Sequence, residues 1–180
     1  AMLEACGAAV VDADQISRQL TAANGAALPA IAQAFGPSLI AADGALDRAR
    51  MRGLIFRQPQ ARQQLEAIIH PLVGQETARQ AQAAMAQGRR MVVYDIPLLV
   101  ESGRWRRQLD AVIVVDCREQ TQIDRVVARN QLSPDAVRGI MAAQASRRQR
   151  RACADVVLFN DAIPLPRLQA QVSLVARSFG

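Results

Sequence analysis

Met91-Val92-Val93-Tyr94-Asp95 is a short apolar run that ends in a carboxylate, and Ile96-Pro97 stops it. Apolar runs without polar alternation are typical of parallel strands that are covered on both faces. Three further runs have the same character: Ala8–Asp12, Ala111–Asp116 and Val156–Asn160. Because helical stretches separate these four runs, we predict an α/β fold with a parallel sheet and right-handed crossovers.

Helical spacing fills the long segment between the first two predicted strands. We predict helices over Leu28–Phe35, from a cap at Asp47 to about Phe56, over Gln60–Ile69 and over Pro71–Gln87. A later helix should begin at Ser133-Pro134-Asp135, which supplies a cap, a first-turn proline and a first-turn acid, and should run to about Arg151. Leu165–Ser178 is the predicted closing helix.

The composition is that of a globular, cytoplasmic protein. The chain has 180 residues, of which 51% are hydrophobic, enough to bury a core. It contains no apolar run near the ~20 residues of a membrane span. Cys6, Cys117 and Cys153 are odd in number and lack metal or CxxC spacing, so we expect reduced thiols and no disulfide framework.

The charge of the chain is carried in an unusual way. The net charge is +6 and all 22 basic residues are arginine, since the sequence contains no lysine. A general bias toward arginine explains the bulk of this, while an anionic ligand would concentrate some guanidinium groups locally. A nucleic-acid binder would interleave basic and aromatic residues, but only 3% of the chain is aromatic. We therefore expect no nucleic-acid partner.

Carboxylates stand where two of the predicted strands end. Asp12 and Asp14 are two residues apart on what reads as an extended segment, so both should project to the same side. Asp95 follows the second strand. Ligands of open α/β sheets bind outside the carboxyl ends of the strands, and carboxylates there suit a proton acceptor or a magnesium partner. The alternative is that these acids only cap the helices that follow.

A cluster of arginines lies near the end of the predicted Pro134 helix. Arg147, Arg150 and Arg151 are three and four residues apart, so they are neighbours on one helix surface. A solvated basic face is one interpretation. The other is a mobile lid, in which arginines neutralise the charge that spreads over phosphoryl oxygens during transfer.

Together these segments resemble the dephospho-coenzyme A kinase family. The resemblance rests on Val11-Asp12-Ala13-Asp14, Asp95 to Glu101, and Gln144-Ala145-Ser146-Arg147, with Gly44 to Arg48 and His70-Pro71 between them. It runs from about residue 3 to residue 175. It implies a P-loop kinase-like parallel sheet with helices on both faces, a helical substrate-binding insertion and a helical lid. The expected regions are residues 1–24, 89–128 and 152–180 for the core, 25–88 for the insertion and 129–151 for the lid.

The family implies a role for particular residues. Asp14 would be the catalytic base or orienting group at the ribose hydroxyl that is phosphorylated. Substrate-binding residues would be Asp12, Arg48, His70, Asp95 and Glu101. Phosphate and lid residues would be Arg129, Arg147 and Arg150, although Asn130 and Arg151 depart from the family pattern. ATP and Mg²⁺ would be the cofactors, dephospho-coenzyme A the small-molecule partner, and no protein metal ligand is assigned.

The phosphate-binding loop of that family, G-x-x-x-x-G-K-[ST], does not occur in this sequence. In the family this loop follows a first, central strand, which is therefore missing here as well. We expect the 180 residues alone to be inactive, and strands left unpaired could join copies into a homo-oligomer. A chain that begins too late and a natural loss both explain the absence. A non-catalytic, ligand-binding remnant of the fold is the alternative function.

Overall fold

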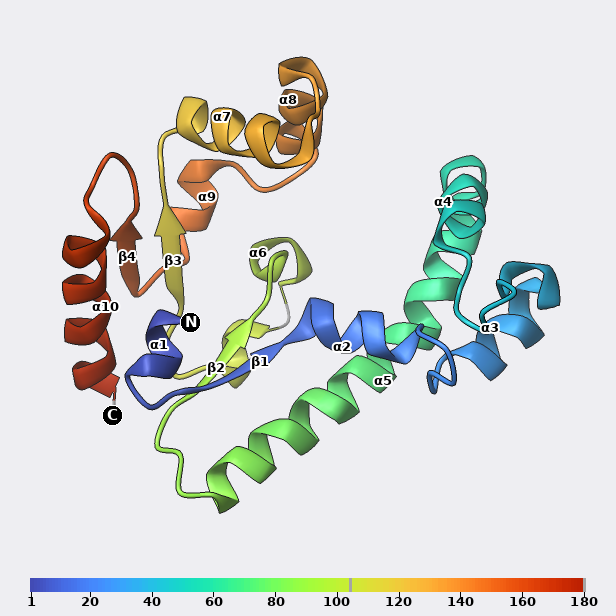
Figure 1. The fold of residues 1–180 in the computed structure, drawn as a ribbon, viewed down its shortest axis with the longest axis horizontal. Helices are drawn as coiled ribbons and strands as arrows, with labels where there is room; N and C mark the ends of the chain where they lie inside the picture. Colours follow the sequence, from blue (N-terminus) through green and yellow to red (C-terminus); the bar gives the residue numbers. More distant parts are fainter. Residues whose placement is uncertain (104, 180) are drawn as a thin grey trace. The chain divides into compact units, whose positions relative to one another are not determined.

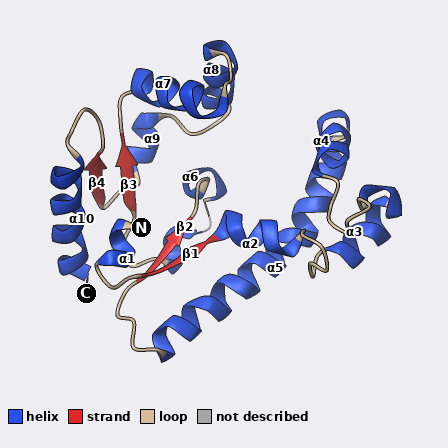
Figure 2. Ribbon diagram, viewed as in Figure 1, coloured by secondary structure: helices blue, strands red, loops and turns tan. Residues whose placement is uncertain are grey.

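The computed structural model describes residues 1–103 and 105–179, which form two compact units (Figures 1 and 2). One unit spans Gly7–Ile96, and the other combines Ala1–Cys6 with the residues from Pro97 on. Each unit carries one pair of short parallel strands surrounded by helices. The predicted α/β class with parallel strands is confirmed.

The Gly7–Ile96 unit contains two strands, a 3₁₀ turn and four helices among its described residues. Their bounds are β1 Ala9–Asp12, α2 Ala13–Leu20, α3 Leu28–Phe35, η1 Pro37–Leu39, α4 Arg48–Arg57, α5 Pro59–Ala86 and β2 Val92–Asp95. β1 and β2 pair in parallel from Ala9 opposite Val92 to Asp12 opposite Asp95. The helical part of this unit packs around its own buried cluster, which includes Ala27 and Ile31.

The other unit contains the remaining elements that the structure describes. Their bounds are α1 Met2–Ala5, α6 Leu99–Ser102, η2 Trp105–Gln108, β3 Ile113–Asp116, α7 Glu119–Asn130, α8 Pro134–Ala142, α9 Arg147–Ala152, β4 Val156–Phe159 and α10 Leu165–Phe179. β3 and β4 pair in parallel. The closing helix α10 lies along β4, and the short α1 lies against α10 (Figure 1).

All four predicted strands are present within two residues of their expected bounds. Among the described residues, β2 pairs with β1 and β3 pairs with β4, so each of these strands has one edge without a strand partner.

The two helices predicted over 60–69 and 71–87 are wrong in one respect, because α5 is continuous from Pro59 to Ala86 with Pro71 inside it. Proline at that position removes one backbone donor and usually ends a helix. Here α5 packs against α2, α4 and β1, and tertiary packing of this kind outweighs a single lost hydrogen bond.

The single helix predicted from Pro134 to about Arg151 is also wrong. The chain forms α8 as far as Ala142 and then a separate α9 that begins at Arg147. Ser146 caps α9 by accepting a hydrogen bond from the Gln149 backbone N–H, and the Gln149 side chain accepts one from the Ser146 N–H. This capping box starts a new helix, because it satisfies N–H groups that a continuous helix would have paired internally.

Candidate active site

The candidate site residues divide between the two units. Asp12, Asp14, Arg48, His70 and Asp95 belong to the unit of residues 7–96, whereas Glu101, Arg129, Arg147 and Arg150 belong to the other. Each group is therefore built from the elements of its own unit.

The structure brings Asp12 and Asp95 side by side at the end of the first strand pair. They are the last residues of β1 and β2 and are partners in the parallel register. Asp95 is exposed and Asp12 is half-buried. Two carboxylates thus stand at the carboxyl edge of this strand pair, which is where the sequence placed them.

Asp14 does not lie on an extended segment with Asp12, as the sequence suggested. The Asp12 Oδ1 atom accepts a hydrogen bond from the Gln15 N–H at 2.8 Å, which starts α2 at Ala13. Asp14 therefore occupies the first turn of α2, two residues after Asp12, which caps this helix. Its side chain is exposed, and the described residues give it no hydrogen-bond or ion-pair partner.

Arg48 and His70 lie on the helices of the same unit. The Arg48 guanidinium donates to the Thr21 hydroxyl at 3.0 Å and to the Arg18 carbonyl at 3.5 Å, so it ties the start of α4 to the end of α2. His70 is exposed on α5. Within the described chain, no hydrogen bond links either residue to the acids at the ends of β1 and β2.

In the other unit, the last residue of β3 holds the first residue of α9. Asp116 is 6% exposed and accepts two hydrogen bonds of 2.8 Å from the Arg147 guanidinium, one on each carboxylate oxygen. Arg151 lies 3.9 Å from the same carboxylate. These guanidinium groups, Arg147 first, lower the pKa of Asp116. The two-point contact fixes α9 against the end of β3.

Glu101 makes a second connection to the same helix. Its Oε1 atom accepts a hydrogen bond from the Ala145 N–H at 2.7 Å and lies 3.6 Å from Arg150 Nη2. Arg150 Nη2 also donates to the Gln144 side-chain oxygen at 2.7 Å. Although burial opposes it, the Ala145 N–H and the Arg150 charge lower the pKa of Glu101.

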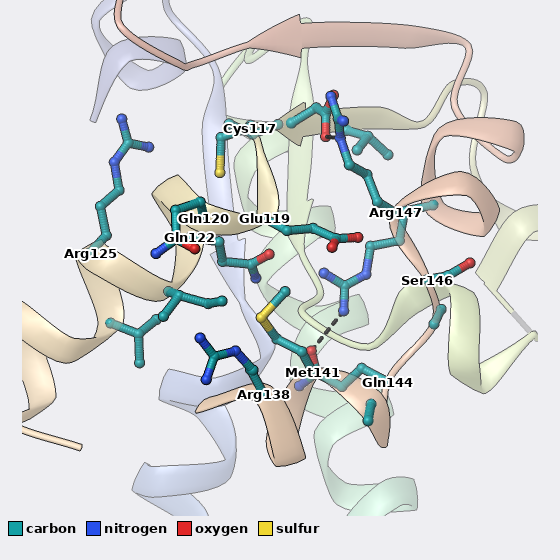
Figure 3. A pocket seen from close by; sticks show the side chains of 18 of the residues that line it. Cys117, Glu119, Gln120, Gln122, Arg125, Arg138, Met141, Gln144, Ser146 and Arg147 are labelled. Carbon is teal, nitrogen blue, oxygen red and sulfur yellow. Dashed lines mark hydrogen bonds and ion pairs between the residues drawn. The ribbon is translucent and has the colours of Figure 1, made fainter. Parts of the chain in front are cut away.

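A pocket of about 1070 Å³ opens between the end of β3 and helices α7, α8 and α9 (Figure 3). Its charged lining is mostly basic and comprises Arg125, Arg129, Arg138, Arg147 and Arg150, with Asp116 and Glu119 as the acids. A large cavity with this excess of guanidinium groups is suited to an anion that carries several oxygen atoms.

Sequence reasoning missed Arg125, Arg138 and Asp116 as pocket residues. The signal for Arg125 was its spacing of four residues from Arg129, which puts both on one face of α7. Asp116 ends a strand just as Asp95 does. Arg138 lies in the middle of α8, and only the position of that helix beside α7 brings it to the pocket.

Asp161 lies in the loop after β4 and holds the start of α7. It is 5% exposed and accepts hydrogen bonds from the Arg118 N–H at 3.0 Å, from Arg118 Nε at 2.7 Å and from the Thr121 hydroxyl at 2.9 Å. These donors lower the pKa of Asp161 to about 2, with the Arg118 side chain as the largest cause. The carboxylate thereby supports the start of α7, whose next turns line the pocket.

The low pKa of Asp161 predicts an acid-sensitive contribution to stability. The pKa of Asp161 is about 2 in the folded protein, and that of an unfolded aspartate is ~3.9. The ionised Asp161 carboxylate therefore contributes fully to the free energy of unfolding above pH ~3.9, and this contribution disappears as the pH falls toward 2. Asp161→Asn should remove this component. Urea unfolding from pH 6 to pH 2 should show the two proteins converging at low pH. A constant difference between them would contradict the assignment.

Residues 1–103 and 105–179 contain no cluster of three or more His, Cys, Asp or Glu side chains that could hold a metal ion. Within the same residues, no helix has the length and apolarity that a bilayer crossing requires.

Comparison with known proteins gives a consistent result. The model of the dephospho-CoA kinase family, CoaE, matches residues 1–164. A dephospho-CoA kinase of Albidiferax ferrireducens is 56% identical over 179 residues, which are 99% of this chain and 84% of the relative. One from Bordetella pertussis is 55% identical over 166 residues, 92% of this chain and 76% of the relative.

Solved structures support the fold. The crystal structure of TT1252 from Thermus thermophilus is similar with a TM-score of 0.79 at 28% identity, covering 99% of this chain and 89% of that one. A dephospho-CoA kinase from Campylobacter jejuni has a TM-score of 0.71 at 21% identity, covering 98% and 87% respectively. Because its sequence identity is only 21%, the similarity to the Campylobacter jejuni structure supports the fold alone.

Proposed function

Because the chain belongs to the dephospho-CoA kinase family, we propose a separate role in phosphoryl transfer for the residue cluster of each unit. The function of the family, and of this chain, is the ATP-dependent phosphorylation of the 3′-hydroxyl of dephospho-coenzyme A in coenzyme A biosynthesis. We assign the acceptor hydroxyl to the carboxylates of the β1–β2 pair and the phosphates to the arginines around α7–α9.

On the acceptor side, Asp14 orients the ribose hydroxyl and accepts its proton. Its exposed carboxylate, which lacks a partner among the described residues, is available to a substrate hydroxyl. A loose phosphoryl-transfer transition state needs little help from a base, so orientation is the larger part of this role. Arg48 and His70 would contact the rest of the substrate from the helical region 25–88.

Asp12 and Asp95 are the residues that would hold Mg²⁺. Paired carboxylates on adjacent strands offer the hard oxygen atoms that this ion takes, usually one or two from protein and the rest from water and phosphates. A pair of acids, with no third ligand nearby in the described residues, fits that pattern. When bound, the ion would neutralise charge on the phosphates of ATP.

On the phosphate side, the pocket of the other unit supplies the positive charge. The observation that carries this proposal is that five arginines line one cavity against two acids. Arg129 and Arg150 would contact the phosphate oxygens directly. Arg147 is already held by both oxygens of Asp116, so a phosphate contact by Arg147 would have to compete with that carboxylate.

The other expectations follow the same proposal. We place the substrate-binding insertion at 25–88, the lid at 129–151 and the core in the remaining residues, in a cytoplasmic enzyme. Association of copies through the edges of β2 and β3 that have no strand partner in the described chain stays a prediction.

The phosphate assignment can be tested by binding. Arg129→Gln and Arg150→Gln should each weaken the binding of inorganic tripolyphosphate to the 180-residue protein by about tenfold, because each removes a charge-assisted hydrogen bond. Arg62→Gln is the matched control, since Arg62 pairs with Glu66 on the surface of α5. Isothermal titration calorimetry at one salt concentration measures the tripolyphosphate affinity of these three variants and of the parent protein. Equal affinity in the two pocket variants and the control would refute the assignment.

A further inference from the structure

In the turn between α8 and α9, one backbone N–H group donates to a residue distant in the sequence. Its four backbone N–H groups lie at residues 143–146, and three of them bond within the turn or the adjoining helices. Ala143 donates to Ile140, Gln144 donates to Met141, and Ser146 donates to the Gln149 side chain. The fourth, at Ala145, donates to Glu101 at 2.7 Å. Glu101 lies 44 positions earlier in the chain, so this hydrogen bond is the tertiary one.

The same carboxylate oxygen faces Arg150. Glu101 Oε1 lies 3.6 Å from Arg150 Nη2, and both side chains are about three-quarters buried, at 23% and 27% exposed. Gln144 accepts a hydrogen bond from the same nitrogen at 2.7 Å. The guanidinium of Arg150 is thus set by a carboxylate and an amide before any ligand arrives, and an arginine oriented in advance loses less freedom on binding.

We infer that Glu101 is a positioning residue, which holds the α8–α9 turn through Ala145 and presents Arg150 to the phosphate pocket. The family resemblance suggested that Glu101 contacts dephospho-coenzyme A. In this inference Glu101 acts through Arg150 instead. The inference rests on the proposed function only in taking Arg150 as a phosphate contact. The tether between Glu101 and Ala145 stands on the geometry alone.

Amide hydrogen exchange measures the tether directly. In the 180-residue protein, Glu101→Ala should speed exchange of the Ala145 amide by about tenfold, because a hydrogen bond to a charged acceptor is lost. Glu101→Gln keeps an acceptor oxygen and should bring exchange back to within about threefold of the parent protein. Glu66→Ala, which removes an exposed carboxylate from α5, is the control and should leave Ala145 unchanged.

A double-mutant cycle with tripolyphosphate measures the consequence for Arg150. Glu101→Ala should weaken binding several-fold in the parent protein, Glu101→Gln should recover part of it, and Glu101→Ala should cost nothing further when Arg150 is already glutamine. Recovery by glutamine and coupling between Glu101 and Arg150 are not expected of a residue that only supports the fold.

The outcomes separate the two proposals. Unchanged Ala145 exchange in Glu101→Ala overturns the tether, whatever the binding data show. An equal binding loss from Glu101→Ala with and without Arg150 overturns the action through Arg150. If Arg150→Gln alone leaves tripolyphosphate affinity unchanged, the phosphate role of Arg150 fails, and faster Ala145 exchange in Glu101→Ala would still support the tether.

Discussion

Incubated with ATP, Mg²⁺ and dephospho-coenzyme A, the 180-residue chain alone should form coenzyme A at a rate many orders of magnitude below that of a family member with a phosphate-binding loop. In P-loop enzymes that loop and its lysine cradle the β- and γ-phosphates. These residues contain neither the loop motif nor any lysine. Since positioning and electrostatic stabilisation make up nearly all of the catalysis of phosphoryl transfer, the arginine pocket cannot substitute for them.

A coupled assay of ADP release, with product confirmed by mass spectrometry, measures this rate. The control is a longer chain in which the same 180 residues follow a strand and a G-x-x-x-x-G-K-[ST] loop. Turnover by the shorter chain at a rate comparable with the longer one would contradict the prediction and would mean that another group binds the phosphates.

In the longer chain, Asp14→Asn should lower kcat by about a hundredfold or more, within the range attributed to a positioned acid or base. The KM for ATP should change by less than about threefold, since Asp14 is assigned to the acceptor hydroxyl and makes no contact with the nucleotide in our account. Steady-state kinetics with both substrates varied provides these constants.

Asp135→Asn is the matched control for Asp14. Both residues are exposed aspartates in the first turn of a helix, so both variants alter the same favourable interaction with a helix N-terminus. Asp135 is not assigned to the chemistry, but it pairs with Arg138 of the pocket at 2.6 Å, so its variant should lower turnover far less than Asp14→Asn does. If Asp14→Asn behaves like Asp135→Asn, then Asp14 serves only the start of α2.

The strands were readable from sequence because each is a short, purely apolar run that ends beside a polar residue. β2 and β3 end at Asp95 and Asp116, and a buried parallel strand leaves this signature without help from distant contacts. Asp47 and Ser133 were also readable as helix caps, and both accept the backbone hydrogen bond that their position predicts.

The helix errors have two different causes. Pro71 is a local signal to stop, and α5 overrides it because its packing against neighbouring helices is set by residues far away in the sequence. The break before Arg147 has a local signal, because Ser146 and Gln149 form a capping box. The helical spacing of the arginines favoured a continuous helix instead.

The site was predictable only as far as strand ends and motifs reveal it. Asp12, Asp14 and Asp95 follow from the strands, whereas the turn that separates Asp14 from Asp12 depends on one side-chain hydrogen bond. The link from Glu101 to Ala145 and the pairing of Asp116 with Arg147 join residues 44 and 31 positions apart. Contacts of that kind depend on the packing of whole elements, and no local pattern announces them.

Product analysis tests the central claim most directly. The longer chain that carries the loop should convert dephospho-coenzyme A and ATP into a product whose new ³¹P resonance is a phosphomonoester on the ribose 3′-hydroxyl, and AMP offered as the acceptor should remain unphosphorylated at an equal enzyme concentration. Phosphorylation of AMP in preference to dephospho-coenzyme A, or a phosphate at any position other than the 3′-hydroxyl, would contradict the account.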